Sequence, residues 1–321
     1  MPRLPNSAID TTPIGIGCAY LTAGSLTKKE HRLIAAAYDA GARHFDVAPM
    51  YGLGTAERVL GEALKGLSGK VTIATKVGIR RGNVSRSKLL ARSLLGPVRG
   101  LVRRKKAAAS PSGPKGRSPV DFSVGFVAQS LEQSLRELGV ERIDCYLLHM
   151  AHREVVTDPL VKFLVDARAA GKVGALGLAT EREDTAPILV DWPGVFDVVQ
   201  YSWSALDPEL VPSAAEPFRI THRALMRALD PMSSWLQADA TRSARLNAAC
   251  DADLTDGRVL SRALIGAALA ENRGGITLVA SRSIERTRNN IEMALDSATV
   301  TLGARLVAAL ANEAALPSVR L

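Results

Sequence analysis

The sequence predicts a single (β/α)8 TIM barrel, residues 1–321, and three observations support this fold class. About eight short apolar runs alternate with segments of helical spacing along the 321 residues. The runs are nearly unbroken, which indicates parallel strands covered by helices on both faces. Eight such repeats favour a closed barrel over a doubly wound sheet. No G-x-G-x-x-G follows a strand, which counts against the dinucleotide-binding doubly wound alternative.

The elements follow from apolar spacing and from the glycines that end segments. The predicted strands are Pro13–Cys18, Arg43–Val47, Val71–Thr75, Ile143–Leu148, Val173–Leu178, Phe196–Gln200, Phe218–Thr221 and Ile276–Val279. The helical segments are the Ala-rich Glu30–Ala40, then Glu57–Leu67, Gly125–Leu138, Leu160–Ala170, Arg258–Glu271, Ile284–Leu295 and the C-terminal Gly303–Ala314. Pro231–Asp256 is expected to be a long connection.

Composition and cysteine usage narrow the class of protein. The chain is 47% hydrophobic and 23% charged, as in an ordinary globular protein. No apolar run approaches the roughly 18 residues of a membrane span, and residues 1–10 lack the apolar segment of a signal peptide. The three cysteines are widely spaced, which excludes a disulfide scaffold and offers no zinc-ligand spacing. We therefore expect a cytoplasmic protein with no transmembrane segment and no metal.

The net charge of +9 comes from one segment. Between Arg80 and Val120 there are 12 basic residues and no acidic one; removing these 12 from the 41 basic residues leaves 29 against 32 acidic. Residues 80–120 are predicted to be a basic, partly disordered insertion at the barrel mouth. Two interpretations stay open: an arm that contacts an anionic partner, or a solvated loop. Nucleic acid is not expected, because no aromatic residues alternate with the basic ones.

In a barrel of this kind, chemistry takes place at the C-terminal ends of the strands. The polar residues at or just after these ends are Asp46, Tyr51, Lys76, His149, Thr180, Gln200 and His222. Each alone has an ordinary explanation, such as a solvated charge, a packing tyrosine or a structural histidine. Because strand ends converge on one mouth, we expect the first four to meet there.

These residue types form a proton donor when they lie together. A tyrosine hydroxyl ordinarily has a pKa of about 10, and a lysine ammonium nearby favours the phenolate. An aspartate that pairs with the lysine holds it in position, and a histidine beside them orients a substrate carbonyl. Such a group can protonate the alkoxide that forms when hydride reaches a carbonyl carbon.

Three stretches carry a family resemblance: HFDVAPMYGLGTAERVLGEAL (His44–Leu64), TIATKVG (Thr72–Gly78) and IDCYLLH (Ile143–His149). They resemble the three signature regions of the aldo-keto reductase superfamily, and the resemblance extends from Pro13 to about Ala298 apart from the insertion. It implies catalytic residues Asp46, Tyr51, Lys76 and His149, with Tyr51 as the general acid. APMYGLGTAE is most similar to the D-threo-aldose 1-dehydrogenase and L-galactose or L-fucose dehydrogenase group.

The resemblance also implies an NADP(H) site in ASRSIERTRNNIEMAL (Ala280–Leu295). It assigns the 2′-phosphate to Ser281 and Arg286 and the adenine side to Asn289 and Asn290. Because of its positive charge, Arg282 is a further candidate for the phosphate. A strand end and a helix start supply backbone N–H groups, and arginine supplies a bidentate phosphate ligand. A basic first helical turn opposes the helix dipole, which favours an anion there. We therefore expect NADP(H) in preference to NAD(H).

The nicotinamide side departs from the family pattern. The family usually has Ser-Asn after its fifth strand, where this chain has Ala179 and Thr180. Gln200 matches the family glutamine beside the carboxamide, and His222 takes the place of the tyrosine that stacks on the nicotinamide. These departures leave open whether the cofactor binds less tightly than is usual in the family.

The sequence thus predicts an NADP(H)-dependent oxidoreductase that moves hydride between nicotinamide and a carbonyl or alcohol carbon of an aldehyde, ketone or aldose. Tyr51 exchanges the proton, Lys76 tunes Tyr51, Asp46 holds Lys76 and His149 orients the oxygen. One alternative is a non-redox barrel that acts as a binding or regulatory protein through its basic insertion. Another is a lyase or isomerase with Tyr51 as base. No segment identifies the small-molecule substrate.

Overall fold

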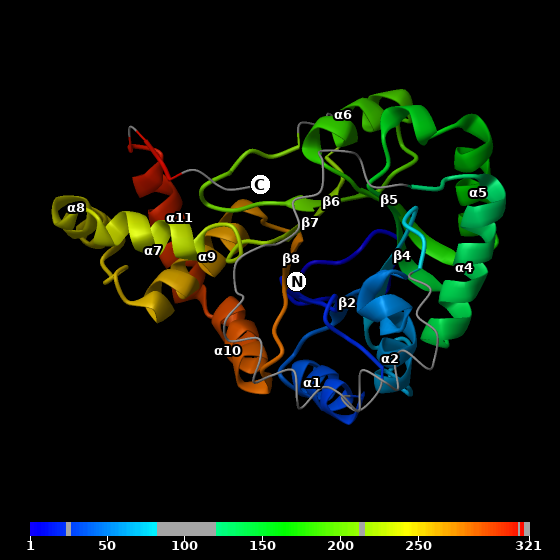
Figure 1. Ribbon diagram of the computed structural model, residues 1–321, viewed down its shortest axis with the longest axis horizontal. Coiled ribbons are helices and arrows are strands. Elements are labelled where there is room, and N and C mark those ends of the chain that lie inside the picture. Colours follow the sequence, from blue (N-terminus) through cyan, green and yellow to red (C-terminus); the bar gives the residue numbers. More distant parts are fainter. Residues whose placement is uncertain (24–26, 82–119, 212–215, 314, 318–321) are drawn as a thin grey trace, which may run out of the picture.

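The computed structural model describes residues 1–23, 27–81, 120–211, 216–313 and 315–317. Eight parallel strands follow one another around a closed barrel in chain order, and the helices surround them (Figure 1). The ring closes because β1 pairs with both of its neighbours, with Ile16 opposite Phe45 of β2 and Val279 of β8. The predicted (β/α)8 fold is confirmed.

The strands are short, as expected for a barrel core. They are β1 (Ile14–Gly17), β2 (His44–Asp46), β3 (Thr72–Val77), β4 (Ile143–His149), β5 (Val173–Ala179), β6 (Val198–Ser202), β7 (Phe218–His222) and β8 (Ile276–Val279). β3, β4 and β7 extend beyond the predicted ends, so that Lys76, His149 and His222 belong to the strands themselves.

Helices cover the outside of the barrel. They are α1 (Thr27–Asp39), α2 (Ala56–Ala63), α4 (Val124–Leu138), α5 (Asp158–Ala169), α6 (Arg182–Asp191), α7 (Leu229–Gln237), α8 (Ala240–Cys250), α9 (Gly257–Glu271), α10 (Ile284–Leu295) and α11 (Ser297–Leu310). Two 3₁₀ turns, η1 (Tyr51–Gly54) and η3 (Arg153–Val155), follow β2 and β4.

The expected long connection Pro231–Asp256 is wrong, because it contains most of α7 and all of α8. Asp239 caps α8 by accepting a hydrogen bond from the Arg242 backbone N–H. Met232 and Leu246 are buried in the apolar cluster that α7, α8, α9 and α11 share. This layer lies outside the barrel strands, beyond α9 (Figure 1). Helix α6, which buries only Thr185 and Ile188, was not predicted.

The start of the chain fills the barrel interior at the N-terminal ends of the strands. Leu4 is 1% exposed and belongs to the cluster of inward-facing strand residues, which includes Leu147 and Ile220. An antiparallel bridge between Arg3 and Asp10 folds this segment back on itself. The N-terminal end of the barrel is therefore closed, and the opposite end carries the open cavity.

The predicted insertion, residues 80–120, lies outside the described residues except for positions 80, 81 and 120. Both its form and the division of the chain into one domain stay predictions. Within the described part of the chain, no individual helix has the length and apolar character to cross a membrane. Helices α10 and α11 meet those criteria only when taken together, and they are bent by 80°.

Candidate active site

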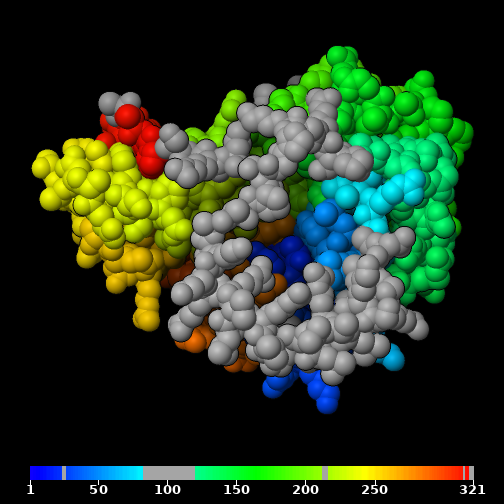
Figure 2. Space-filling view, in the orientation of Figure 1, coloured from blue at the N-terminus to red at the C-terminus, as the bar shows by residue number. Residues whose placement is uncertain are grey.

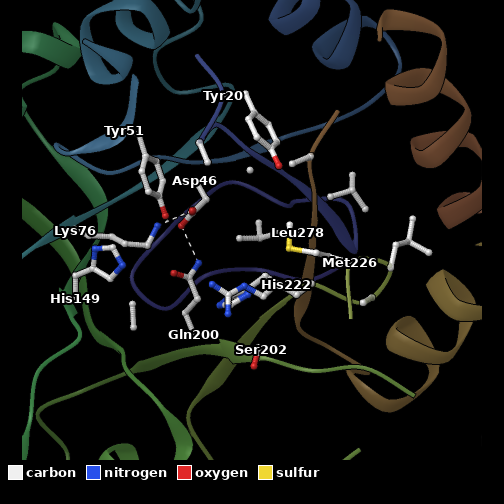
Figure 3. A pocket seen from close by; sticks show the side chains of 18 of the residues that line it. Tyr20, Asp46, Tyr51, Lys76, His149, Gln200, Ser202, His222, Met226 and Leu278 are labelled. Atoms are coloured by element: carbon white, nitrogen blue, oxygen red, sulfur yellow. Dashed lines mark hydrogen bonds and ion pairs between the residues drawn. The ribbon is translucent and has the colours of Figure 1, made fainter. Parts of the chain in front are cut away.

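A cavity of about 400 Å³ opens at the C-terminal ends of the strands (Figure 3). Strand-end residues form its floor, among them Gly17, Asp46, Lys76, His149, Gln200, His222 and Val279. Residues from the first and last strands border the same opening because β1 pairs with β8. Figure 2 shows these blue and orange parts of the surface next to each other at the centre of this face.

A buried ion pair lies at the centre of the cavity floor. Lys76 Nζ on β3 donates hydrogen bonds to Asp46 Oδ1 (2.6 Å) and to the Val47 carbonyl (3.1 Å). Lys76 and Asp46 are only 2% and 4% exposed. Burial by itself lowers the pKa of Lys76, but the charges of Asp46 and Tyr51 and the hydrogen bond with Asp46 raise it above its ordinary value. Lys76 therefore remains an ammonium despite its burial.

The loop after β2 brings Tyr51 over this pair. Gly52 has φ +57°, and a Cβ there would lie 1.8 Å from the Leu21 carbonyl oxygen, so the close approach requires glycine. Thr55 closes the turn: its hydroxyl donates to the Gly52 carbonyl (2.7 Å) and accepts from the Ala23 N–H (3.0 Å). The sequence Asp-x4-Tyr thus becomes a rigid turn that holds the phenol at the cavity.

Tyr51 contacts both of its expected partners. Lys76 Nζ lies 5.3 Å from the centre of the Tyr51 ring, and the His149 ring meets the Tyr51 ring edge to face with 6.4 Å between centroids. In Figure 3 the Tyr51 hydroxyl points toward the Lys76 ammonium, with His149 beside them. The structure therefore brings together the four side chains that the sequence places at strand ends.

Two histidines of the cavity are held uncharged. Burial, with the charges of Lys76 and Arg223, lowers the pKa of His149 to about 3. Burial, with Arg223 as the largest charge contribution, likewise lowers the pKa of His222 to about 3. Both imidazoles are neutral at physiological pH, so each has one ring nitrogen that donates and one that accepts hydrogen bonds. A neutral His149 can donate a hydrogen bond to a carbonyl oxygen.

The residues expected on the nicotinamide side line the cavity, with two unforeseen contacts. Gln200 Nε2 donates to Asp46 Oδ2 at 2.7 Å, so Gln200 is bound to the ion pair. The Thr180 hydroxyl lies 2.5 Å from the Thr185 hydroxyl of α6. His222 ends β7 and faces the same space.

The residues expected to bind the 2′-phosphate and adenine lie together at the junction of β8 and α10, but only Asn290 lines the cavity itself. Ser281 Oγ accepts from the Ser283 N–H (3.1 Å), and Ser283 caps α10 by accepting from the Arg286 N–H (3.3 Å). The Arg282 guanidinium lies 4.9 Å from the centre of the Tyr20 ring. Arg286 and Asn289 are exposed on the first turns of α10.

Sequence reasoning missed several residues of the lining: Met150, Glu181, Arg223, Leu225 and Met226. Three of them directly follow a residue that it had selected, at His149, Thr180 and His222. This position, one or two residues beyond the strand end, was the available signal. Among the described residues, no group of three or more His, Cys, Asp or Glu side chains is arranged to hold a metal ion.

Fold and site together define the class of protein: a (β/α)8 barrel with a cavity of polar residues at the C-terminal ends of its strands. Residues 13–215 match the aldo/keto reductase family, and the chain belongs to that family. The family uses a nicotinamide cofactor. The family resemblance of the sequence is thereby confirmed, while the similarity to a particular aldose dehydrogenase group stays a prediction.

Two curated relatives have named activities. The chain is 29% identical to pyridoxal 4-dehydrogenase of Microbacterium luteolum over 194 residues. This aligned segment covers 54% of this chain and 54% of that protein. The chain is 26% identical over 268 residues to 6-dehydroglucose reductase of Novosphingobium aromaticivorans, covering 79% of this chain and 74% of that protein. The first match therefore spans about half the length of the relative.

Solved structures share the fold. An aldo-keto reductase of Bacillus halodurans in its holo form aligns with a TM-score of 0.68 at 17% identity, over 95% of both chains. A glycerol dehydrogenase of Gluconobacter oxydans aligns with a TM-score of 0.68 at 18% identity, over 97% of this chain and 96% of that chain. An aldo-keto reductase of Klebsiella pneumoniae in complex with NADPH aligns with a TM-score of 0.59 at 20% identity, over 88% of this chain and 86% of that chain.

Proposed function

We propose that this chain is an NADP(H)-dependent reductase or dehydrogenase that interconverts a carbonyl and an alcohol, with Tyr51 as the proton donor and acceptor. The observation that carries the proposal is the buried Lys76–Asp46 pair directly beside the Tyr51 ring. A buried ion pair has a large desolvation cost and is weak support for stability, so its place beneath a tyrosine at a barrel mouth favours catalysis.

The residues present suit a dinucleotide. The cavity reaches from Tyr51 and His149 to Asn290 on α10, and the capped start of α10 presents exposed Arg282 and Arg286. Gln200, Thr180 and His222 would hold the nicotinamide end; Ser281, Arg282, Arg286, Asn289 and Asn290 would hold the adenosine end. When bound, the cofactor supplies or accepts the hydride.

The protein's own groups handle the proton. In the reducing direction, the substrate carbonyl oxygen accepts hydrogen bonds from the Tyr51 hydroxyl and from neutral His149. As hydride adds to the carbon, the oxygen becomes an alkoxide and takes the Tyr51 proton. The Lys76 ammonium stabilises the phenolate left behind, and Asp46 keeps Lys76 in place. Oxidation of an alcohol runs the same steps backwards.

The preference for NADP(H) rests on charge at the start of α10. Among the described residues, the Arg286 side chain makes no ion pair. The Arg282 guanidinium lies over the Tyr20 ring, and its charge partly offsets the rise in the pKa of Glu30 that burial causes, without forming a close ion pair with it. Two exposed guanidinium groups beside a helix N-terminus suit a phosphate dianion, which NADP(H) carries and NAD(H) lacks. Substrates would be small aldehydes, ketones or aldoses, consistent with the sugar and pyridoxal names of two relatives.

A fluorescence titration of the purified protein with NADPH and, in parallel, with NADH tests the cofactor assignment. Saturable binding with a lower Kd for NADPH is expected, followed by NADPH consumption in a screen of aldehydes, ketones and aldoses. Failure to bind either nucleotide would contradict the proposal. The family match does not favour the alternative of a non-redox barrel that acts through its basic insertion.

A further inference from the structure

Arg223 is a charged residue of the cavity that the proposed mechanism does not use. It directly follows His222 at the end of β7 and lines the same cavity as Tyr51 and His149. It is exposed, yet its charge acts on the reaction centre, since it is among the causes that lower the pKa of both His149 and His222. Glu181, the other unpaired charge of the lining, is not among those causes.

No carboxylate of the described residues pairs with this cation, not even Glu181, which lines the same cavity. Asp207 accepts from Arg182 at 2.5 Å and pairs with Arg227 at 3.5 Å, so two other arginines already occupy it. No hydrogen bond or ion pair joins the Arg223 side chain to any residue that the structure describes. Arg223 therefore presents a free guanidinium to the cavity, whereas Arg182 and Arg227 are structural.

The backbone holds Arg223 in a conformation that a non-glycine residue rarely adopts. Its φ is +67°, in the left-handed region. Hydrogen bonds on both sides fix this turn: the Trp203 N–H donates to the His222 carbonyl (3.0 Å), and the Arg227 N–H donates to the Arg223 carbonyl (3.2 Å). A glycine or asparagine would fit this position with less strain, so the backbone conformation by itself does not account for an arginine here.

We propose that Arg223 is the substrate-specificity residue of this cavity and binds a carboxylate or phosphate group carried by the substrate. This inference rests on the proposed function and adds to it the class of substrate: an aldehyde, ketone or sugar derivative with an anionic group. A guanidinium forms paired hydrogen bonds with a carboxylate or phosphate, and such charge-assisted bonds are the strong ones. The ion pair Lys76–Asp46 is already satisfied, so Arg223 is left to attract the anion.

The same chemistry could serve the pyrophosphate of the cofactor, and the experiment separates the two sources. Steady-state kcat/KM is measured at saturating NADPH for two matched pairs, butanal with succinic semialdehyde and benzaldehyde with 4-carboxybenzaldehyde. The wild-type enzyme is expected to favour the carboxylate member of each pair by about 10- to 100-fold, the range of one charged hydrogen-bonded contact. Added salt reduces that advantage.

Arg223→Asn tests the residue, because asparagine tolerates a left-handed backbone. It is expected to lower kcat/KM for the carboxylate substrates by about 10- to 100-fold and to leave the neutral aldehydes within about threefold. Arg223→Lys should retain part of the preference. Arg227→Asn is the matched control four residues further along the chain, and its carboxylate-to-neutral ratio should equal that of the wild type. A fall in NADPH affinity of Arg223→Asn with an unchanged substrate ratio would assign Arg223 to the cofactor and overturn the proposal.

A direct binding measurement keeps this test independent of turnover. Calorimetry with benzoate and with benzamide on the wild type and on Arg223→Asn, both loaded with NADP⁺, compares an anion with its neutral analogue. Tighter binding of benzoate that disappears in Arg223→Asn supports the anion site. Equal affinity of both proteins for benzoate overturns it. An enzyme that reduces neither member of either pair counts against the proposed function, whereas the benzoate comparison tests the role of Arg223 without any turnover.

Discussion

The side-chain amide of Gln200 donates a hydrogen bond of 2.7 Å to Asp46 Oδ2, the carboxylate oxygen that Lys76 leaves free (Figure 3). Gln200 and Asp46 are 3% and 4% exposed, and 154 residues separate them in the sequence. Each oxygen of Asp46 thus has a partner, one on β3 and one on β6. The position of the ion pair beneath Tyr51 depends on two strands from opposite halves of the chain.

The first prediction is that Gln200→Met lowers stability as well as cofactor affinity. Methionine has a similar volume but leaves Asp46 Oδ2 buried without a donor, which costs about 1–3 kcal/mol. We expect the free energy of unfolding to fall by that amount in urea denaturation without cofactor, and kcat to fall by about tenfold. Thr180→Val is the comparison variant, because Thr180 also lies at the nicotinamide end but contacts Thr185 and not Asp46, so both Asp46 oxygens keep their donors in it. A loss of NADPH affinity with unchanged stability and kcat would confine Gln200 to the cofactor.

The second prediction concerns the proton donor. Tyr51→Phe keeps the ring that contacts His149 and Lys76 but removes the hydroxyl. Because general acid catalysis contributes about 10²- to 10⁴-fold, we expect kcat to fall by that factor with little change in NADPH affinity. Tyr20→Phe removes a hydroxyl from the same cavity and should retain most of the activity. Near-wild-type turnover of Tyr51→Phe would contradict the proposed mechanism.

The third prediction concerns the choice of cofactor. Arg286 is exposed on the first turn of α10, where a 2′-phosphate is expected. Arg286→Ala should raise the Kd for NADPH by about 10- to 100-fold, the value of a charged hydrogen-bonded contact, and change the Kd for NADH by less than about threefold. Arg288→Ala, an exposed arginine on the same helix, is the matched control. Equal losses for both nucleotides in Arg286→Ala would show that Arg286 does not bind the 2′-phosphate.

The fourth prediction is a loss of stability in weak acid. His44 is fully buried in β2, donates or accepts one hydrogen bond with Thr72 (2.9 Å), and its Nε2 atom has no partner. Burial lowers the pKa of His44 to about 4. Below the unfolded pKa of about 6.5 the unfolded chain takes up a proton that the folded chain does not, so stability falls with decreasing pH until about pH 4.

Between pH 7 and pH 5 this contribution of His44 amounts to about 2 kcal/mol, since one pKa unit corresponds to about 1.4 kcal/mol. His149 and His222, whose pKa values are lowered to about 3, act in the same direction. Urea denaturation at both pH values measures the loss. In His44→Asn, where an amide can still contact Thr72, the loss should be smaller by about 2 kcal/mol. An identical loss in wild type and variant would contradict this assignment.

The sequence by itself determined the fold and the position of the side chains that we propose to be catalytic. Continuous apolar runs separated by helices require a covered parallel sheet, and eight of them close into a barrel. Residues at strand ends must then share one mouth, which is why Asp46, Lys76 and His149 could be selected from local patterns. The Asp-x4-Tyr spacing, read through the family resemblance, added Tyr51.

Only the tertiary structure decided which groups touch across the barrel. The bond between Gln200 and Asp46 depends on how β2 and β6 are staggered across the ring, and no local period encodes that relation. The left-handed backbone of Arg223 is imposed by hydrogen bonds to its surroundings, since its own side chain disfavours it. Likewise Leu4 enters the barrel interior only because the folded strands leave space for it. Local sequence sets what each element is, whereas contacts between distant elements depend on the register and packing of the whole ring.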